Sequence, residues 1–574
     1  MTRAARRGLL IVGIVVATLL VVSFAARLAR RPARNTVLVM NVEGEIPEQS
    51  AHDFLTRLFG GDQLTLADHL EALAKAKQDD RISGLFLSVD RNDLGWARTQ
   101  ELRDAIRDFR ASGKWAVAYM ETAGEFSPGN KEYYLATACE AIWLAPPGDI
   151  NLVGIRAEAP FLRGALDKLD IYPDYASIGK YKSAKDLFTD RTMTAAHRES
   201  MDRIVGSLYG QLTAGIAEGR RKDEDEVRTI IDRGPYIGPK ALEGGLVDGL
   251  AYHDEVEEQL REKNGGTLPK IKTGRYLKNG RYFDRGVKIA VVYGTGAVVR
   301  GEGGHDPFSG SGAFGSDTVA DAIRKAREDG SIKAIVLRVQ SPGGSYVASD
   351  IVWREVKRTK GVKPIVVSMG DVAASGGYFV SMAADRIVAE PATLTASIGV
   401  VAGKFVTTGF WNKIGITSDA VQRGRHATYF SGDQQYTPEE RALFQEWLER
   451  IYKDFVTKVA DGRGKTFDEI HAIAQGRVWS GQDAIGHGLV DEPGGLLTAV
   501  RVALRLANKD PEARVQIVEY PEPEGMFDRF LGDANGTRGV VDQVRARVLG
   551  VLEDGPVPSP GETVLRMPYE PRIR

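Results

Sequence analysis

The same order of predicted elements occurs twice along this chain, and that internal repeat limits the possible folds more than any other feature. Each copy has an amphipathic helix that leads into an apolar strand, and a second helix–strand pair farther on. The matching segments are 69–89 with 319–339, 133–146 with 378–391 and, more loosely, 244–248 with 486–491. Helices that alternate with apolar strands are typical of parallel α/β layers. The sequence therefore predicts an α/β protein with two tandem domains that arose by duplication.

The length of the chain agrees with two domains, because 574 residues exceed the size at which a single hydrophobic core stops growing, about 250–300 residues. We expect one domain over residues 36–270 and a second over 286–508, joined by a polar linker at 271–285. After residue 508 the sequence is rich in Pro and Gly, which predicts a loosely packed tail over 509–574.

An uncharged apolar run precedes the first domain. It covers residues 8–26, and 19 residues at 1.5 Å each are just enough to cross the hydrocarbon core of a bilayer. We interpret it as a retained transmembrane anchor preceded by a short cytoplasmic tail at 1–7, with a cleavable signal peptide as the alternative. Arginines flank the run on both sides, so charge does not decide its orientation.

A candidate nucleophile lies in the second copy, at Ser375. An apolar run at 364–368 precedes the glycine-flanked segment Gly370–Tyr378, and a helix-like run follows it. This order predicts a buried strand, a tight turn and a helix, with the serine hydroxyl presented beside backbone N–H groups. Such a turn offers acyl-transfer chemistry a nucleophile and donors for an oxyanion. Close packing and a helix N-cap are the structural alternative for the same residues.

The two copies differ at the positions that this chemistry needs. A constant offset of 245 residues places Asn130 of the first copy opposite Ser375. After its strand the second copy has Ser341–Gly344, a Ser-Pro-Gly-Gly turn that suits an oxyanion hole, where the first copy has Arg91–Leu94. We therefore expect any active site to use the serine and glycines of the second copy.

A general base for Ser375 is less evident. Lys182 of the first copy lies opposite Ala427 at the same offset, which indicates one active site divided between the copies. His426 is the alternative base, although we interpret it as a solvated loop histidine. Lys180 and Lys185 flank Lys182 and are interpreted as solvated charges.

Composition excludes several classes of function. The chain has 76 basic and 77 acidic residues, so no positive surplus indicates binding to nucleic acid. Its single cysteine, Cys139, rules out an intramolecular disulfide and cysteine-rich metal sites, and its apolar surroundings predict a buried thiol. We expect no metal and no cofactor.

Four motifs together resemble the signal peptide peptidase A (protease IV) family, in its long membrane-anchored form within the ClpP/crotonase-like superfamily. They are Tyr181–Ala184, Ser341–Gly344, Ala374–Gly377 and Thr395–Gly399. The resemblance implies that Ser375 is the nucleophile, Lys182 the general base and Ser397 its hydrogen-bonding partner. It also implies that the backbone N–H groups of Gly344 and Gly376 form the oxyanion hole. The first copy has Leu152 where the second has Ser397, as a structural partner would.

The same resemblance implies two tandem ClpP/crotonase-like domains in a homotetramer. It places them on the outer face of the cytoplasmic membrane, where they degrade signal peptides by an acyl-enzyme mechanism. For Lys182 to accept a proton at neutral pH, burial between the domains must lower its pKa from about 10.4. Two functions of a different class would also fit a duplicated α/β chain, namely a crotonase-like enzyme acting on acyl-CoA and a catalytically silent membrane scaffold.

Overall fold

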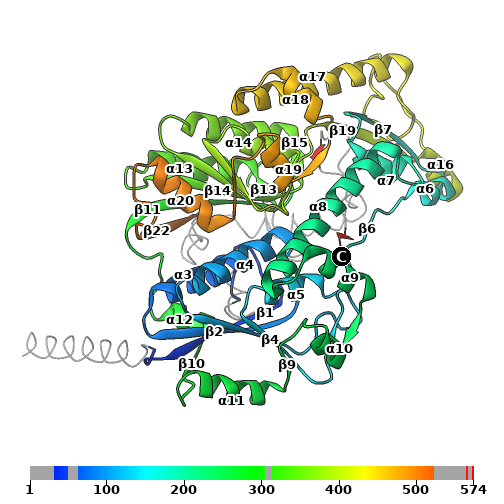
Figure 1. Cartoon of the computed structure of the whole chain (residues 1–574). Helices are drawn as coiled ribbons and strands as arrows, with labels where there is room; N and C mark the ends of the chain where they lie inside the picture. The colour runs from blue at the N-terminus through cyan, green and yellow to red at the C-terminus, as the bar shows by residue number, and fades with distance from the viewer. Residues whose placement is uncertain (1–31, 50–62, 304–312, 522–563, 567–571, 574) are drawn as a thin grey trace, which may run out of the picture.

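The computed structural model describes residues 32–49, 63–303, 313–521, 564–566 and 572–573. Each half of the chain builds a parallel sheet flanked by helices (Figure 1). In spatial order the first sheet contains β10 (Lys270–Lys272), β1 (Thr36–Gly44), β2 (Ile82–Asn92), β3 (Trp115–Met120), β4 (Ala141–Leu144) and β9 (Gly249–Leu250). The corresponding run in the second sheet is β22 (Val515–Tyr520), β11 (Val287–Thr295), β14 (Ala334–Ser341), β16 (Ile365–Ala374), β17 (Arg386–Ala389) and β21 (Glu492–Pro493).

The two sheets have the same strand order and direction, which confirms the predicted duplication. Every pairing in these two runs is parallel. The second sheet also continues from the end of β16 into β18 (Leu394–Ala396) and the antiparallel β20 (Val478–Ser480). This extension places Ala396 and Ser397 beside Ser375.

Helices cover the sheets on both faces. Those of the first half are α3 (Leu66–Gln78), α4 (Trp96–Arg110), α5 (Asn130–Ala136), α6 (Arg163–Leu169), α7 (Asp186–Thr189), α8 (Ala195–Arg220), α9 (Glu224–Arg233), α10 (Gly238–Glu243), α11 (His253–Lys263) and α12 (Thr273–Lys278). Those of the second half are α13 (Ser316–Glu328), α14 (Tyr346–Thr359), α15 (Gly376–Ser381), α16 (Thr408–Lys413), α17 (Pro438–Arg463), α18 (Phe467–Ile473), α19 (Gly481–Gly486) and α20 (Leu496–Leu506). The predicted repeat helices thus appear as α3 and α13.

One hydrophobic core joins the halves. Along β11 and β14 successive side chains point to opposite faces of the sheet. Val291 and Val336 belong to a core that also contains Leu38 and Leu85 of the first sheet, whereas the alternate residues pack under α13, α14 and α17. The two sheets therefore lie on either side of a shared apolar layer that includes α3, α4 and α20 (Figure 1).

A third, mixed sheet combines strands from the two halves and from the carboxy-terminal segment. Its order is β13 (Phe314–Gly315), β12 (Val298–Val299), β15 (Gly343–Ser345), β23 (Val564–Arg566), β19 (Val400–Val406) and β7 (Tyr172–Ile178). β7 comes from the first half and pairs antiparallel with β19 along seven residues. The remaining strands form two separate two-stranded sheets. One pairs β5 (Asp149–Ile150) with β8 (Tyr236–Ile237), and the other pairs β6 (Ala157–Glu158) with β24 (Arg572–Ile573).

Ordered structure extends into segments that we expected to be linker and tail. β10 and α12 lie at 270–278, largely within the predicted linker, and complete the first sheet and its helical cover. β22 lies beyond residue 508 and is an edge strand of the second sheet, as β10 is of the first. The expected anchor at 8–26 falls outside the described residues. Among the residues that are described, none of the helices is long and apolar enough to span a bilayer.

Candidate active site

Ser375 stands at the sharp turn that the sequence predicts. It follows β16 directly and is the N-cap residue of α15. Its backbone has φ 54° and ψ −111°, a conformation that costs an L-residue free energy and is seen mainly where surrounding structure enforces it. A hydrogen bond from Ser375 N to Ala396 O, at 2.7 Å, helps to hold the turn. The serine is completely buried.

Ser397 lies on the neighbouring segment in a similarly rare backbone conformation. Ala396 and Ser397 both have positive φ, at 63° and 52°. Ser397 N donates to Arg477 O at 2.9 Å, and Gly476 N donates to Ile398 O at 2.7 Å. Three non-glycine residues with left-handed φ thus meet around the Ser375 hydroxyl, which is a concentration typical of functional sites.

Lys182, from the first half of the chain, reaches both serines. Its Nζ lies 2.7 Å from Ser375 Oγ, 3.0 Å from Ser397 Oγ and 3.0 Å from Ser397 O. Only 1% of the lysine is exposed. Burial lowers its pKa well below the usual value, and no charged neighbour opposes that shift. An amine held neutral in this way can accept a proton from a hydroxyl.

The loop that carries Lys182 is embedded in the second half of the chain. It follows β7, whose pairing with β19 fixes the direction of approach. Tyr181 N donates to Gln475 O at 2.8 Å. Gly476 has φ +79°, and a Cβ at this position would lie 2.5 Å from Lys182 Cβ. Glycine is therefore required at 476 both for the turn and for the close approach of the lysine.

The two glycines expected to form an oxyanion hole lie next to each other. A Cβ on Gly376 would lie 3.0 Å from Gly344 N and 3.1 Å from Gly343 Cα. Gly344 belongs to β15, and Gly376 begins α15. This close approach of backbones places the Ser-Pro-Gly-Gly turn against the first turn of the helix that follows Ser375.

The remaining candidates lie away from this cluster. His426 is partly exposed, and its Nε2 lies 3.7 Å from Glu439 rather than near Ser375. Lys180 is exposed beside Tyr181 and Glu199, and Lys185 pairs with Asp186. Lys180 is thus a surface charge, as interpreted, whereas Lys185 is partly buried in its ion pair with Asp186.

The matching position of the first copy is built differently. Asn130 uses its side chain to donate to Gly154 O at 2.9 Å and to accept from Val153 N at 3.1 Å. Leu152 is completely buried in the shared core, where the second copy has Ser397. Asn130 thus bonds the backbone of residues 153 and 154, and Leu152 packs in the core. In the first copy both equivalent residues have a structural role.

Sequence reasoning missed the residues that hold the site together. Nothing in the sequence around Gly476 indicates that it belongs to the site, because only the fold brings it against Lys182. Arg338 and Asp371 could have been noticed, since each is the one charged residue of a largely apolar strand. Arg338 is fully buried and bonds Glu48 and Glu101 of the first half.

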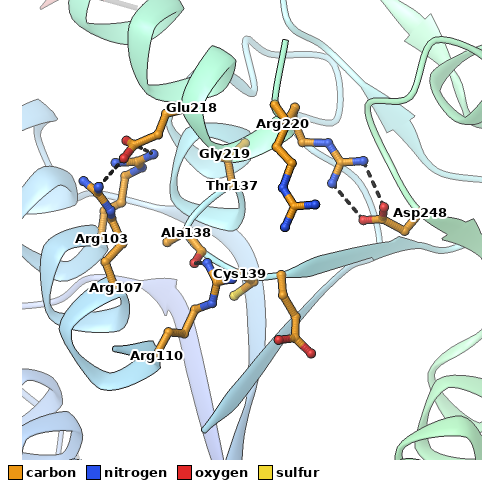
Figure 2. A pocket seen from close by; sticks show the side chains of 12 residues that line it. Arg103, Arg107, Arg110, Thr137, Ala138, Cys139, Glu218, Gly219, Arg220 and Asp248 are labelled. Carbon is orange, nitrogen blue, oxygen red and sulfur yellow. Dashed lines mark hydrogen bonds and ion pairs between the residues drawn. The ribbon is translucent and has the colours of Figure 1, made fainter. Parts of the chain in front are cut away.

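A cavity of about 490 Å³ lies elsewhere, on the first half of the chain. Its wall holds five arginines and three carboxylates around the ends of α4, α5 and α8. Figure 2 shows Arg103 and Arg107 turned toward Glu218, and Arg220 paired with Asp248. Cys139 lines it, and burial raises the pKa of this thiol to about 12, as expected for an inert cysteine. No cluster of side chains suited to a metal occurs within the described ranges.

Comparison with known proteins agrees with this division into two copies. The profile of peptidase family S49 matches twice, at residues 108–266 and 357–510. The chloroplastic serine protease SPPA of Arabidopsis thaliana is 33% identical over 552 residues, which cover 91% of this chain and 79% of that protein. Protease 4 of Salmonella typhi is 37% identical over 463 residues, which cover 77% and 72%. Protease 4 of Haemophilus influenzae is 30% identical over 542 residues, which cover 88% and 85%.

Among solved structures, a ClpP1 mutant from Listeria monocytogenes aligns at 14% identity and a TM-score of 0.23, over 37% of this chain and 92% of that one. A score this low carries no weight for the assignment. The two matches to the family profile, and the relatives that align along most of their length, establish the family without this structure. The chain belongs to peptidase family S49 and is a serine peptidase.

Proposed function

We propose that the chain is a membrane-anchored serine endopeptidase that uses Ser375 as nucleophile and Lys182 as general base. The observation that carries the proposal is the 2.7 Å contact between Lys182 Nζ and Ser375 Oγ in a fully buried setting. A nucleophile and a base within hydrogen-bond reach are the minimum requirement for covalent catalysis by a serine.

The three contacts of Lys182 Nζ match the hydrogen-bonding capacity of a neutral amine. Such an amine has two N–H donors and one lone pair. Donation to Ser397 O and Ser397 Oγ uses the two N–H groups, each at 3.0 Å. The lone pair then faces Ser375 Oγ, so the serine donates its O–H to the lysine. Ser397 thereby orients the base, which is the role that we assign to it.

The chemical steps follow from this arrangement. Ser375 Oγ attacks the carbonyl carbon of the scissile peptide while its proton passes to Lys182 Nζ. The backbone N–H groups of Gly344 and Gly376 stabilise the resulting oxyanion, and each such donor contributes about 3 kcal/mol in serine peptidases. Lys182 returns the proton to the leaving amine, which departs and leaves an acyl-enzyme. Water then attacks the acyl carbon while its proton passes to Lys182. The ester bond to Ser375 Oγ breaks, the acid is released, and Lys182 returns the proton to Ser375 Oγ.

The third sheet suggests how a peptide would bind. β23 lies between β15 and β19, antiparallel to both, with Leu565 opposite Gly344 and Val564 opposite Val401. A segment of this chain thus lies as an extended strand along the proposed oxyanion turn. We infer that a substrate takes the same course, adding main-chain hydrogen bonds to the edge of β15.

The natural setting is proposed by analogy with the relatives. We infer that residues 8–26 anchor the chain in the cytoplasmic membrane and that the catalytic part faces the extracytoplasmic side. We also propose that two ClpP/crotonase-like domains, 36–270 and 286–508 with β22 added to the second, assemble as a homotetramer. The substrates proposed are cleaved signal peptides and other small apolar peptides.

The test is activity-based labelling of the purified protein together with peptide hydrolysis. A fluorophosphonate probe should label wild-type protein at Ser375, and a signal-peptide substrate should be cleaved. Both should be lost in Ser375→Ala, whereas Ser381→Ala, on the same helix, should keep both. Absence of labelling and hydrolysis in folded wild-type protein would reject the proposal and favour a scaffold.

Hydrolysis by single variants also distinguishes the Ser375/Lys182 peptidase from an acyl-CoA enzyme and from a histidine base. A crotonase-like enzyme acting on acyl-CoA does not require a nucleophilic serine, so its turnover would survive Ser375→Ala. A Ser375/His426 pair would lose activity in His426→Ala, a variant that we expect to be fully active because His426 lies beside Glu439.

A further inference from the structure

Arg338 and Asp371 are largely buried charged residues within two strands of the second half that lead into the site, and both are bonded to helix α4 of the first half. We propose that Asp371 and Arg338 are positioning residues, which fix Ser375 and the Ser341–Gly344 turn relative to each other through α4. The inference rests on the proposed function, because it assumes that Ser375 is the nucleophile. It gives the first half a second role beyond supplying Lys182.

Asp371 lies on β16, four residues before Ser375. Its carboxylate accepts from Gly95 N at 3.2 Å and Arg98 N at 3.0 Å, and it forms an ion pair with Arg98. The bond from Arg98 N is the one that an N-cap side chain accepts from the third helical residue, and the bond from Gly95 N is the one that the N3 side chain accepts in a capping box. The N-cap residue of α4 is Gly95, and a Cβ there would lie 2.2 Å from the Asp371 carboxyl carbon. Asp371 therefore caps α4 from the other half of the chain.

The charge of Asp371 is maintained in this setting. Burial alone would raise the pKa of its carboxyl, but Arg98 and the backbone donors outweigh burial, and the pKa lies below its usual value. Neutralising or removing the carboxylate would leave Arg98 inside the protein without its main partner. That loss is costly because a buried unpaired charge is poorly solvated.

Arg338 lies on β14, three residues before Ser341. Its guanidinium donates to Glu101 of α4 at 2.8 Å, to both oxygens of Glu48 at 3.0 Å, and to Ser368 Oγ of β16 at 2.9 Å. It thus joins β14 to β16 as well as to the first half. These bonds fix the arginine in one orientation within the sheet.

The capping is reciprocal. Glu101 of α4 accepts a hydrogen bond from Leu496 N, the first residue of α20 in the second half. The N-cap residue of α20 is Gly495, and a Cβ there would lie 2.2 Å from the Glu101 carboxyl carbon. Each half therefore caps a helix of the other, with a glycine at each N-cap to admit the partner's carboxylate. A shift of α4 would move the ends of both β14 and β16.

The experiment compares Asp371→Ala and Asp371→Asn with a control at Glu355. Asp371→Ala removes the cap and the ion pair, and we expect kcat to fall about 10²-fold with KM little changed, the loss typical of a misplacement near 1 Å. Asn is as good an N-cap as Asp, so Asp371→Asn should recover part of that loss. Glu355→Ala breaks the Arg327–Glu355 ion pair within the second half, and it should lower the melting temperature without changing kcat.

Two readouts separate positioning from general destabilisation. The rate constant for fluorophosphonate labelling of Ser375, measured per folded molecule, should fall with kcat in Asp371→Ala and partly recover in Asp371→Asn. The midpoint of the pH profile should not move, because Lys182 does not contact Asp371 or Arg338. Glu101→Gln, which keeps the shape of the side chain, should lower kcat in the same way and tests the inference should Asp371→Ala not fold.

The outcomes are distinct from those for the proposed function. Wild-type protein that hydrolyses peptide through Ser375, with unchanged labelling and kcat in folded Asp371→Ala, Asp371→Asn and Glu101→Gln, overturns the positioning role and leaves the peptidase intact. Wild-type protein without Ser375-dependent labelling overturns the peptidase itself.

Discussion

The two halves share a strand order, yet only the second has the turn geometry of a serine peptidase. At equivalent positions the second half has Ser375 with left-handed φ, and the first has Asn130 at the start of an ordinary helix. The scaffold around these positions is the same. Tyr378 donates to Leu489 O and Tyr133 to Leu246 O, at 3.0 Å and 2.7 Å. Both halves thus keep this framework contact, and the proposed chemistry uses Ser375 of the second half.

The difference shows what a structural copy can contribute to an active site. The first half supplies Lys182 on a loop that enters the second half, and its helix α4 bonds Asp371 and Arg338 on the strands that lead to Ser375 and to the Ser341–Gly344 turn. Lys182 lies on the loop that follows β7, and β7 pairs with β19 of the second half.

Removing the lysine should have the largest effect. Lys182→Met deletes the proposed general base, and we expect kcat to fall about 10³–10⁴-fold. Lys180→Met, two residues away and exposed, should be close to wild type. Peptide hydrolysis by the two purified variants measures the difference. Substantial turnover in folded Lys182→Met would reject the division of the site between the halves.

The same variant should be more stable than wild type at neutral pH. Burial lowers the pKa of Lys182 in the folded state, so at pH values between that pKa and about 10.4 the unfolded chain binds a proton that the folded chain lacks. The free energy of unfolding therefore rises with pH across this window. Lys182→Met lacks this dependence, so its advantage in melting temperature should shrink as the pH approaches 10.4.

A methyl group at Gly476 should have the next largest effect. Gly476→Ala places a Cβ 2.5 Å from Lys182 Cβ and should displace the amine, lowering kcat about 10²-fold. Gly415→Ala is the matched control, because Gly415 has φ +81° but its Cβ would have no neighbour within 4 Å. Both variants strain the backbone, and only the first should lose activity. Equal activity in the two would contradict the close approach at residue 476.

Removing the carboxy-terminal segment should have a smaller effect. β23 pairs with β15 beside Gly344, where we infer that substrate binds. A chain ending at residue 521 frees that edge, and we expect KM to fall a few-fold with kcat unchanged. Steady-state kinetics on a peptide substrate measures the change. An unaltered or higher KM would show that β23 does not compete with substrate.

Restoring a serine to the first half should have no effect at all. Asn130→Ser places a serine where the first half matches Ser375. Leu152 still occupies the place of Ser397, and the residue that matches Lys182 in the repeat is Ala427. We expect a fluorophosphonate probe to label one serine per chain in Asn130→Ser, as in wild type. A second labelled serine at residue 130 would show that the first half retains a latent site.

Much of this architecture could be predicted from sequence, because duplication repeats the hydrophobic pattern and because small residues crowd around Ser375. The helices at 66–78 and 316–328 and the strand–turn–helix at 365–381 follow from local periodicity and turn chemistry. The position of Lys182 beside Ser375 and Ser397 was expected, and the described geometry brings all three together.

The parts that could not be predicted depend on contacts between distant segments. Gly476 is one of 64 glycines, and nothing local marks it as the residue against which Lys182 packs. The edge strands β10 and β22 are short, and their pairing with β1 and β11 depends on the tertiary fold. The cap that Asp371 provides to α4 joins residues 276 apart in the sequence.

The most direct test of the divided site is the pH dependence of kcat/KM for the wild-type chain. Since only the neutral amine of Lys182 accepts a proton, kcat/KM should rise with pH through the pKa of that lysine in the free enzyme. We predict a midpoint well below 10.4, because burial lowers this pKa. A midpoint near 10.4, or one that is the same in Lys182→Met, would contradict a buried neutral lysine as the base.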